Sequence, residues 1–199
     1  RMLLYNSQIS GNCWKVRQIL AHRGIAYETR ELDVVDRSNR PEVLGGLNPA
    51  LRVPTIVLDD GRPLAESNAI LLHFAEGTEY LPTDPYERAQ VYQWLFFEQY
   101  NHEPSIAVAR FQVQYAPVKP TEARLAELHE AGYRALDAME GRLAEHDYLV
   151  GDSYTVADIA LYAYTQVAED GGFDLSRYPG ITVWLARIAA PPGHRTPAV

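Results

Sequence analysis

The spacing of hydrophobic residues changes along the chain and separates a first part of mixed character from a longer helical part. In residues 1–76, short alternating runs typical of strands follow runs that repeat every three or four residues, as in helices. This pattern predicts a strand over 2–6, a helix over 13–23, a strand over 27–34, a short helix or turn over 41–47, a hairpin over 55–65 and a helix from Ser67. Beyond residue 85 the spacing is helical, and it predicts helices over 85–115, 121–146, 155–167 and 181–190.

The order of these elements indicates a fold class and a division of the chain. A β-α-β unit followed by a β-β-α unit is the thioredoxin-like layout, in which a mixed sheet carries helices on its faces. The segment 77–85 has two prolines and no periodicity, which is typical of a linker. We therefore expect an α/β thioredoxin-like domain over 1–77, a linker over 78–86 and an all-helical domain over 87–199.

The segment around Val53-Pro54 predicts a hairpin with an unusual entry. Thr55 to Leu58 has the pattern of one strand, Asp60-Gly61 that of a tight turn, and Arg62 to Ala65 that of the second strand. A proline at the start of a strand in a tight turn favours a cis bond. We expect the Val53-Pro54 bond to be cis and to turn the main-chain N–H and C=O of Val53 outward, where they can pair with a bound peptide.

The pair Glu66-Ser67 begins the next helix and has the chemistry of a binding site. Ser67 at a helix N-terminus offers a hydroxyl, a backbone N–H and the positive end of the helix dipole to a carboxylate. Glu66 beside it suits an ammonium group. A ligand with a peptide backbone, a carboxylate and an amine fits this arrangement, and the γ-glutamyl end of glutathione has all three.

Four motifs, in order, resemble those of the soluble, cytosolic-type glutathione S-transferases of bacteria. Val53-Pro54 and the run from Glu66 resemble the glutathione site, and Ser10-Gly-Asn-Cys-Trp-Lys-Val-Arg17 resembles the nucleophile-activating turn of the serine-type classes. Thr155-Val-Ala-Asp158 resembles the capping box of the helical domain. The resemblance covers the whole chain and implies glutathione as co-substrate without a further cofactor, and a homodimer.

Ser10 has two interpretations. Serine between a strand and a helix is an ordinary helix N-cap. The resemblance implies that its hydroxyl donates to the sulfur of glutathione and favours the thiolate, assisted by a hydrogen bond from Asn12. A free thiol has a pKa of about 8.5, and lowering it by about two units requires roughly 2.7 kcal/mol. A charge-assisted hydrogen bond and a helix N-terminus supply energies of that order.

Cys13 also leaves two interpretations open. It falls in the first turn of a predicted helix, where a buried structural thiol is favoured. In one bacterial class of the family a cysteine near this position contacts the glutathione sulfur, which implies a mixed disulfide. Trp14-Lys-Val-Arg17 also resembles the maleylacetoacetate isomerase class, although Gly11 and Asn12 depart from that class's pattern.

Other residues are candidates for ligand contacts or for structure alone. Arg52 precedes Val53 and is expected to reach the glycyl carboxylate, whereas Arg40 is interpreted as a solvated surface arginine. Tyr100 and Pro104 are the candidates for the pocket of the second substrate, and Pro104 is expected to kink its helix. The aromatic residues near them are expected mostly in the core or a subunit interface. The Thr155–Asp158 box is expected to govern folding only.

Composition excludes several partners. A net charge of −8 argues against nucleic acid and anionic membrane surfaces. No apolar run approaches the roughly 20 residues that span a bilayer. A single cysteine excludes an internal disulfide, so a reducing cytoplasm is the expected location. The histidines lack metal-ligand spacing, so we expect no metal site.

These observations predict a glutathione transferase that activates the thiol for attack on a small hydrophobic electrophile, as in detoxification. One alternative is glutathione-dependent disulfide or peroxide reduction, in which the same thiolate attacks sulfur or oxygen. A second is a non-catalytic interaction module with the same fold. The intact set of Ser10, Val53-Pro54 and Glu66-Ser67 disfavours that module, since it needs no glutathione site.

Overall fold

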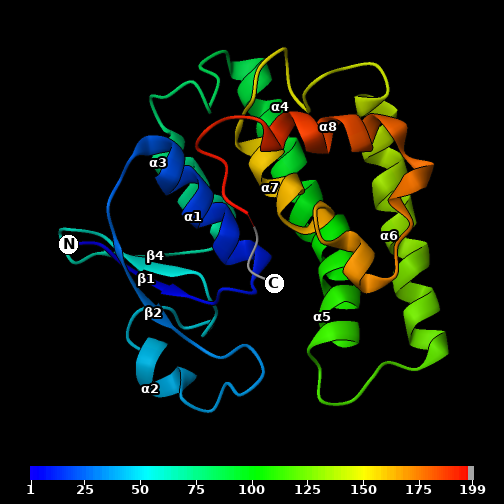
Figure 1. The fold of residues 1–199 in the computed structure, drawn as a ribbon. Helices are drawn as coiled ribbons and strands as arrows, with labels where there is room; N and C mark the ends of the chain where they lie inside the picture. The colour runs from blue at the N-terminus through cyan, green and yellow to red at the C-terminus, as the bar shows by residue number, and fades with distance from the viewer. Residues whose placement is uncertain (197–199) are drawn as a thin grey trace. The chain divides into compact units, whose positions relative to one another are not determined.

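The first unit is a four-stranded sheet with helices on its faces. The computed structural model describes residues 1–196 of the chain. The elements of this unit, in order, are β1 (Leu3–Asn6), α1 (Gly11–Arg23), β2 (Glu28–Glu31), α2 (Arg40–Leu44), β3 (Thr55–Val57), β4 (Pro63–Ala65) and α3 (Ser67–Ala75). Figure 1 shows α1 and α3 side by side on one face of the sheet and α2 on the other.

The sheet is mixed, with strand order β2-β1-β3-β4. β1 pairs in parallel with β2 and antiparallel with β3, and β3 pairs antiparallel with β4, with Ile56 opposite Leu64. The hairpin closes through Gly61, whose φ of 88° favours glycine. The predicted thioredoxin-like layout is therefore confirmed.

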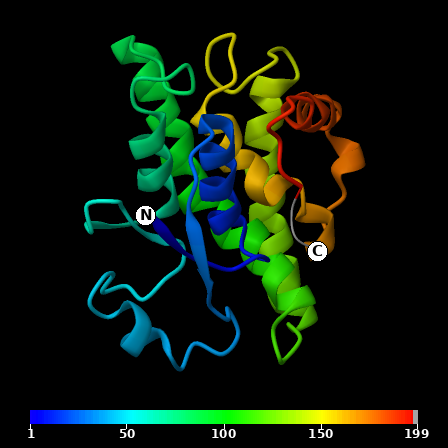
Figure 2. The same ribbon diagram turned by 60° about the vertical axis from the view of Figure 1, so that its left-hand side comes forward.

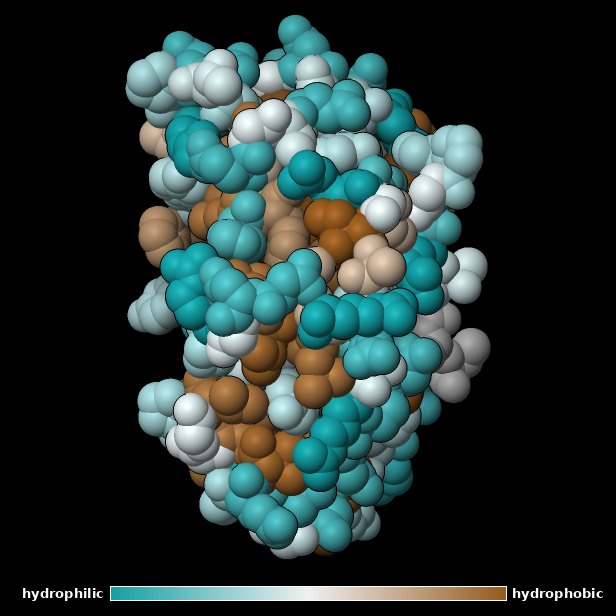
Figure 3. Space-filling view, turned by 90° about the vertical axis from the view of Figure 1, so that its left-hand side faces the viewer, coloured by the Kyte–Doolittle hydropathy of each residue, from teal (hydrophilic) through white to brown (hydrophobic). Residues whose placement is uncertain are grey.

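Apolar residues cover both faces of this sheet. Val16, Ile19 and Leu20 share one side of α1 and are fully buried, as the helical spacing predicts. On the α2 side a smaller cluster forms around Tyr5 and Leu44. The outer members of this cluster are only partly buried. Figure 3 shows hydrophobic atoms, in brown, on the lower part of this face, at the height at which Figure 1 shows α2.

The second unit is helical throughout its regular elements, which confirms the second half of the predicted fold class. Its elements are α4 (Pro85–Phe97), η1 (Glu98–Ala107), α5 (Val108–Gln114), α6 (Glu122–Leu143), α7 (Val156–Thr165), η2 (Ala168–Gly171), η3 (Leu175–Arg177) and α8 (Pro179–Ala189). Figure 2 shows α6 running back alongside the α4–η1–α5 run. Among residues 1–196, no helix has the length and apolar character needed to cross a membrane.

The predicted 85–115 helix contains a segment with wider turns. Where the sequence predicts a kink at Pro104, η1 is ten residues of π-helix with Pro104 inside it. Proline has no N–H, and its ring clashes with the carbonyl four residues earlier in an α-helix. The wider π turn moves that carbonyl away from the ring.

The chain groups into two compact units by its internal contacts. Residues 1–76 form one unit and residues 77–192 the other, and the segment from Gly193 groups with the first. The predicted helical domain extends to residue 199, whereas residues 193–195 bond to α1. The Gln18 side chain donates to the Gly193 carbonyl at 2.9 Å and accepts from the Arg195 N–H at 2.9 Å. The Trp14 indole donates to the Arg195 carbonyl at 3.1 Å.

Candidate functional site

Ser10 begins α1 and is both a helix cap and a potential donor. Its Oγ accepts the N–H of Cys13 at 3.1 Å, and its φ and ψ of −78° and 123° are those of an N-cap. The cap uses the oxygen as acceptor and leaves the hydroxyl proton to donate, and in this structure the Ser10 side chain also hydrogen-bonds the Cys13 thiol. The capping interpretation is therefore correct, and it is compatible with the predicted contact to sulfur.

Cys13 is fully buried in the first turn of α1, as the structural interpretation predicts. Its sulfur accepts the Ser7 N–H at 3.4 Å. Burial raises the pKa of the Cys13 thiol, by more than the hydrogen bonds from Ser10 and Ser7 lower it. A raised pKa keeps the side chain a thiol at neutral pH, so this environment does not favour a nucleophile.

Arg17 is a residue of the site that the sequence analysis did not single out. Its guanidinium is 4% exposed, and its Nη1 donates to Asn6 Oδ1 at 2.5 Å and to the Ser7 carbonyl at 3.2 Å. Its Nη2 donates to the Gln8 carbonyl at 3.2 Å. Burial lowers the pKa of Arg17. These bonds fix the chain just before Ser10.

A set of side-chain hydrogen bonds joins α1 to the start of α3. Ser67 Oγ lies 3.3 Å from Asn12 Oδ1 and donates to it. Lys15 Nζ donates to Ser67 Oγ at 3.2 Å and to Asn68 Oδ1 at 3.1 Å. The fold thus brings the predicted activating turn and the predicted carboxylate site into direct contact, and adds Lys15, which the sequence analysis did not consider.

Glu66 has a strained backbone at the start of α3. Its φ and ψ are 71° and 114°, and its side chain is exposed and makes no capping bond. A non-glycine residue at such a φ costs on the order of 1–3 kcal/mol. The first turn of α3 contains no acidic residue. The N–H groups at this end therefore lack the side-chain acceptor that usually satisfies them.

The Val53-Pro54 bond is cis, as predicted. The main-chain N–H and C=O of Val53 form no hydrogen bond within the part of the chain that the structure describes. The preceding residue, Arg52, is exposed, while its carbonyl accepts from Asn48 Nδ2 at 3.2 Å and from Thr55 Oγ1 at 2.8 Å. Arg52 is thus anchored by its main chain, and its side chain reaches solvent.

The interpretation of Arg40 as a solvated surface arginine is wrong. Arg40 is 2% exposed, and its guanidinium donates to the carbonyls of Leu51 and Asp33, both at 2.9 Å. Burial lowers its pKa. Leu51, which Arg40 holds, has a positive φ of 57°. Arg40 therefore shapes the loop that leads to Val53, and no local spacing in the sequence distinguishes it from a surface arginine.

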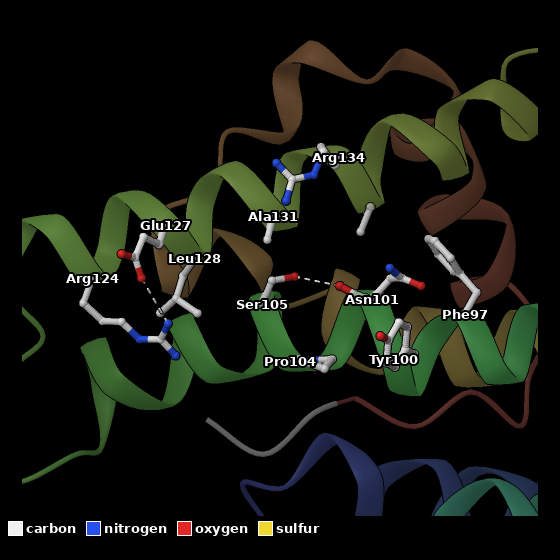
Figure 4. A pocket seen from close by; sticks show the side chains of 11 residues that line it. Phe97, Tyr100, Asn101, Pro104, Ser105, Arg124, Glu127, Leu128, Ala131 and Arg134 are labelled. Carbon is white, nitrogen blue, oxygen red and sulfur yellow. Dashed lines mark hydrogen bonds and ion pairs between the residues drawn. The ribbon is translucent and has the colours of Figure 1, made fainter.

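Tyr100 and Pro104 lie on η1 and line one pocket of about 400 Å³ between η1 and α6. Figure 4 shows Asn101 and Ser105 of η1 on the side toward Leu128 and Ala131 of α6, and Tyr100 and Pro104 farther from α6. Tyr100 is 83% exposed. The aromatic residues predicted in a core or an interface are half-buried or exposed in this chain: Tyr92, Trp94, Phe96, Phe97, Tyr100 and Phe111. None of them is fully buried within this chain, so a subunit interface stays the prediction for most of them and the pocket that for Tyr100.

The groups that converge at the site are polar, and in the described part of the chain they do not form a metal-ligand cluster. Among residues 1–196, no three His, Cys, Asp or Glu side chains gather so that they could hold a metal ion. The groups that converge are hydroxyls, amides and cations from α1 and α3. Such groups bind anions and stabilise a developing thiolate.

Two family models match most of the chain. A model of the glutathione S-transferase N-terminal domain matches residues 9–76, and one of the C-terminal domain matches 98–192. Glutathione S-transferase 3 of Zea mays is 30% identical, over 96% of this chain and 90% of its own.

Solved structures are similar over nearly the whole chain. A glutathione S-transferase from Pseudomonas fluorescens is 48% identical with a TM-score of 0.93, and the match covers 98% of each chain. Ure2p in complex with glutathione is 26% identical with a TM-score of 0.85, over 96% of this chain and 95% of that one. The same yeast protein is also represented by its nitrogen regulation fragment.

Proposed function

Because the chain belongs to the glutathione S-transferase family, we propose that it binds glutathione on its first unit and transfers it to an electrophile. The observation that carries this proposal is the hydrogen bond between Ser67 and Asn12. It joins a group suited to the γ-glutamyl carboxylate with the turn that contains Ser10. One molecule the size of glutathione can therefore contact both.

The ligand's groups have separate partners in this proposal. The γ-glutamyl carboxylate binds the Ser67 hydroxyl and the N-terminus of α3, and the ammonium binds Glu66. The peptide backbone of glutathione pairs with the main chain of Val53, which precedes Pro54. The N–H and C=O of Val53 have no other partner among the described residues. The glycyl carboxylate binds the exposed Arg52.

The chemical step is attack by a thiolate. Ser10 donates its hydroxyl proton in a hydrogen bond to the sulfur, with Asn12 close by, and so lowers the thiol pKa. The thiol proton passes to solvent water. A lone pair of the resulting thiolate sulfur then forms a bond to an electrophilic carbon, and a leaving group departs from that carbon with its electron pair. Two units of thiol pKa correspond to roughly 2.7 kcal/mol, which a charge-assisted hydrogen bond and the α1 N-terminus supply together.

The electrophile, the assembly and the location belong to the proposal as well. Tyr100 and Pro104 contact a small hydrophobic electrophile, and the protein is a homodimer that works in the cytoplasm. The half-buried and exposed aromatic side chains of α4 and η1 favour a second copy as partner. Sedimentation at micromolar concentration measures the mass, and a monomer contradicts the dimer.

The test follows the thiolate directly. Wild-type protein should be retained on immobilised glutathione, and the ultraviolet absorbance of bound thiolate should titrate below the pKa of the free thiol. Ser10→Ala should keep its affinity, raise the titration midpoint and lower turnover roughly tenfold per pKa unit.

Cys13→Ala is the matched control, and it should reduce stability while leaving the titration midpoint unchanged. An unchanged midpoint in Ser10→Ala contradicts the assignment of Ser10. If Cys13→Ala instead abolishes thiol transfer, the mixed-disulfide mechanism is correct.

A second candidate is a glutathione-dependent reductase, because Asn12 lies at the same turn and the same thiolate can attack a disulfide or peroxide. Assays with a disulfide and with an aryl halide, at equal glutathione concentration, separate the two reactions. A third candidate, an interaction module, is favoured by the similarity to Ure2p and its nitrogen regulation fragment. Glutathione binding without turnover on either substrate supports that third candidate.

A further inference from the structure

Lys15 is a buried cation inside the proposed glutathione site. Its side chain projects from α1 toward the start of α3 and is 0% exposed. Its Nζ lies 3.2 Å from Ser67 Oγ and 3.1 Å from Asn68 Oδ1. Lysine is almost never fully buried without polar contacts, so these bonds hold it in place.

The hydrogen bonds at Ser67 have a fixed direction. A lysine ammonium only donates, so Ser67 Oγ must accept from Lys15. The hydroxyl proton of Ser67 is then directed away from Lys15. Its acceptor is Asn12 Oδ1 at 3.3 Å, or a ligand oxygen placed near Asn12. Without Lys15, the Ser67 proton would lose this constraint.

The charge at this position also has a consequence. The N-terminus of α3 carries the positive end of the helix dipole, and its first turn contains no acidic residue. The Lys15 ammonium adds a positive charge at the same end. An anion bound at Ser67 is attracted by both, whereas an uncharged group gains little.

We propose that Lys15 is a positioning residue for the γ-glutamyl carboxylate, acting through the hydroxyl of Ser67. The inference rests on the proposed function, since it places that carboxylate at Ser67. Lys15 orients the Ser67 proton toward the carboxylate and adds positive charge behind it. Removal of Lys15 therefore weakens binding of the carboxylate and leaves contacts to the rest of glutathione unchanged.

The test compares two ligands on one variant. Lys15→Met keeps the buried volume and removes the charge and the donors. Calorimetry should show glutathione binding weakened about tenfold or more, as expected for a hydrogen bond to a charged group. A glutathione analogue that lacks the γ-glutamyl α-carboxylate should bind Lys15→Met and wild type within about twofold. A purely structural role would weaken both ligands equally, and that result contradicts the proposal.

The sequence provides a matched control, because Lys15 and Lys119 are its only lysines. Lys119 is exposed, and its Nζ donates to the Val113 carbonyl at 2.7 Å. Lys119→Met should bind both ligands as wild type does. In a Ser67→Ala background, Lys15→Met should weaken glutathione binding less than it does in the wild type, because only the contribution of the charge remains once the hydroxyl is gone.

A measurement on wild-type protein covers the case in which Lys15→Met does not fold. With ¹³C-lysine labelling the spectrum contains two Cε signals, and Lys119→Arg assigns them. The Lys15 signal should move on addition of glutathione and stay in place with the analogue. Equal movement with both ligands contradicts the role of Lys15. Wild-type protein that binds no glutathione contradicts the proposed function instead.

Discussion

The N-termini of α3 and α7 begin with similar residues and use them in opposite ways. At α7, Thr155 Oγ1 accepts the Ala157 N–H at 3.2 Å, and Asp158 Oδ2 accepts the Thr155 N–H at 3.0 Å. Asp158 Oδ1 also accepts from the Leu149 N–H at 3.1 Å and the Trp184 indole at 2.9 Å. The predicted capping box is confirmed, and every acceptor in it is used within the protein.

At α3 the corresponding side chains do not cap the helix. Glu66 makes no capping bond and has a positive φ, while the Ser67 hydroxyl points to Asn12. The difference shows that one helix start bonds its own N–H groups whereas the other leaves them for the ligand that we propose. A helix start that satisfies its own N–H groups stabilises the fold, and one that leaves them unsatisfied can bind an anion.

The largest expected effect concerns the N-terminus of α7, where the capping box satisfies its own N–H groups. Asp158→Ala removes the acceptor of three buried N–H groups and should lower the unfolding free energy by about 3 kcal/mol or more. Urea unfolding followed by circular dichroism measures it. Thr155→Ala, which removes one bond, should lose only about 1 kcal/mol. Equal losses in the two variants would show that Asp158 contributes no more than an ordinary cap.

The pH dependence of the same residue gives the next effect. Burial raises the pKa of Asp158 to about 6, above its value of about 3.9 in unfolded chains. The folded state therefore holds the proton more tightly, and this contribution to stability is present below about pH 4 and lost as pH rises through about 6. The stability gap between wild type and Asp158→Asn should narrow over that range by roughly 3 kcal/mol at most. A constant gap contradicts the raised pKa.

Mutation at the N-terminus of α3, which has no such capping bonds, should affect glutathione binding as well as stability. Ser67→Ala removes no capping bond, but it takes one acceptor from the buried Lys15 ammonium, so the unfolding free energy should fall by about 1–2 kcal/mol, less than in Asp158→Ala. The loss of one hydroxyl donor to a carboxylate should weaken glutathione binding about tenfold. Calorimetry measures the affinity and urea unfolding the stability. A stability loss as large as that of Asp158→Ala would remove the distinction between the two helix starts.

The smallest expected effect is a gain in stability. Glu66→Gly relieves the positive φ of 71°, and after the greater chain entropy of glycine the net gain should be about 1 kcal/mol or less. Glutathione affinity should fall, because the partner of the ammonium group is lost. Thermal unfolding without ligand measures the change in stability, and calorimetry measures the change in glutathione affinity. A variant that binds glutathione as tightly as wild type does would exclude Glu66 from the site.

Local sequence patterns predicted those elements whose cause is local. The Asp60-Gly61 turn, the Ser67 helix start and the Thr155–Asp158 box depend on residues within a few positions of one another. Their predicted places agree with the structure. The extent of π-helix in η1 was missed, because hydrophobic spacing indicates a helix without distinguishing its kind.

The predicted site residues are far apart in the sequence, and only the fold brings them together. Asn12 and Ser67 are 55 positions apart, and their contact depends on how α1 packs beside α3. Arg17, Lys15 and Arg40 were missed or misread, because a cation on a helix usually faces solvent. Only packing shows that all three are buried and bound to carbonyls, hydroxyls or amides.

By itself, the sequence determined the fold class, the hairpin, the helix starts and the family of this protein. The fold class, the hairpin and the helix starts follow from turn chemistry, capping and hydrophobic period, which act between near neighbours, and the family follows from the resemblance of four motifs. The tertiary structure alone decided which polar side chains are buried together, and so which of them contact Ser67 or hold the chain just before Ser10. The reason is that burial of a charge depends on partners from distant segments, and each partner's position is set by the packing of whole helices.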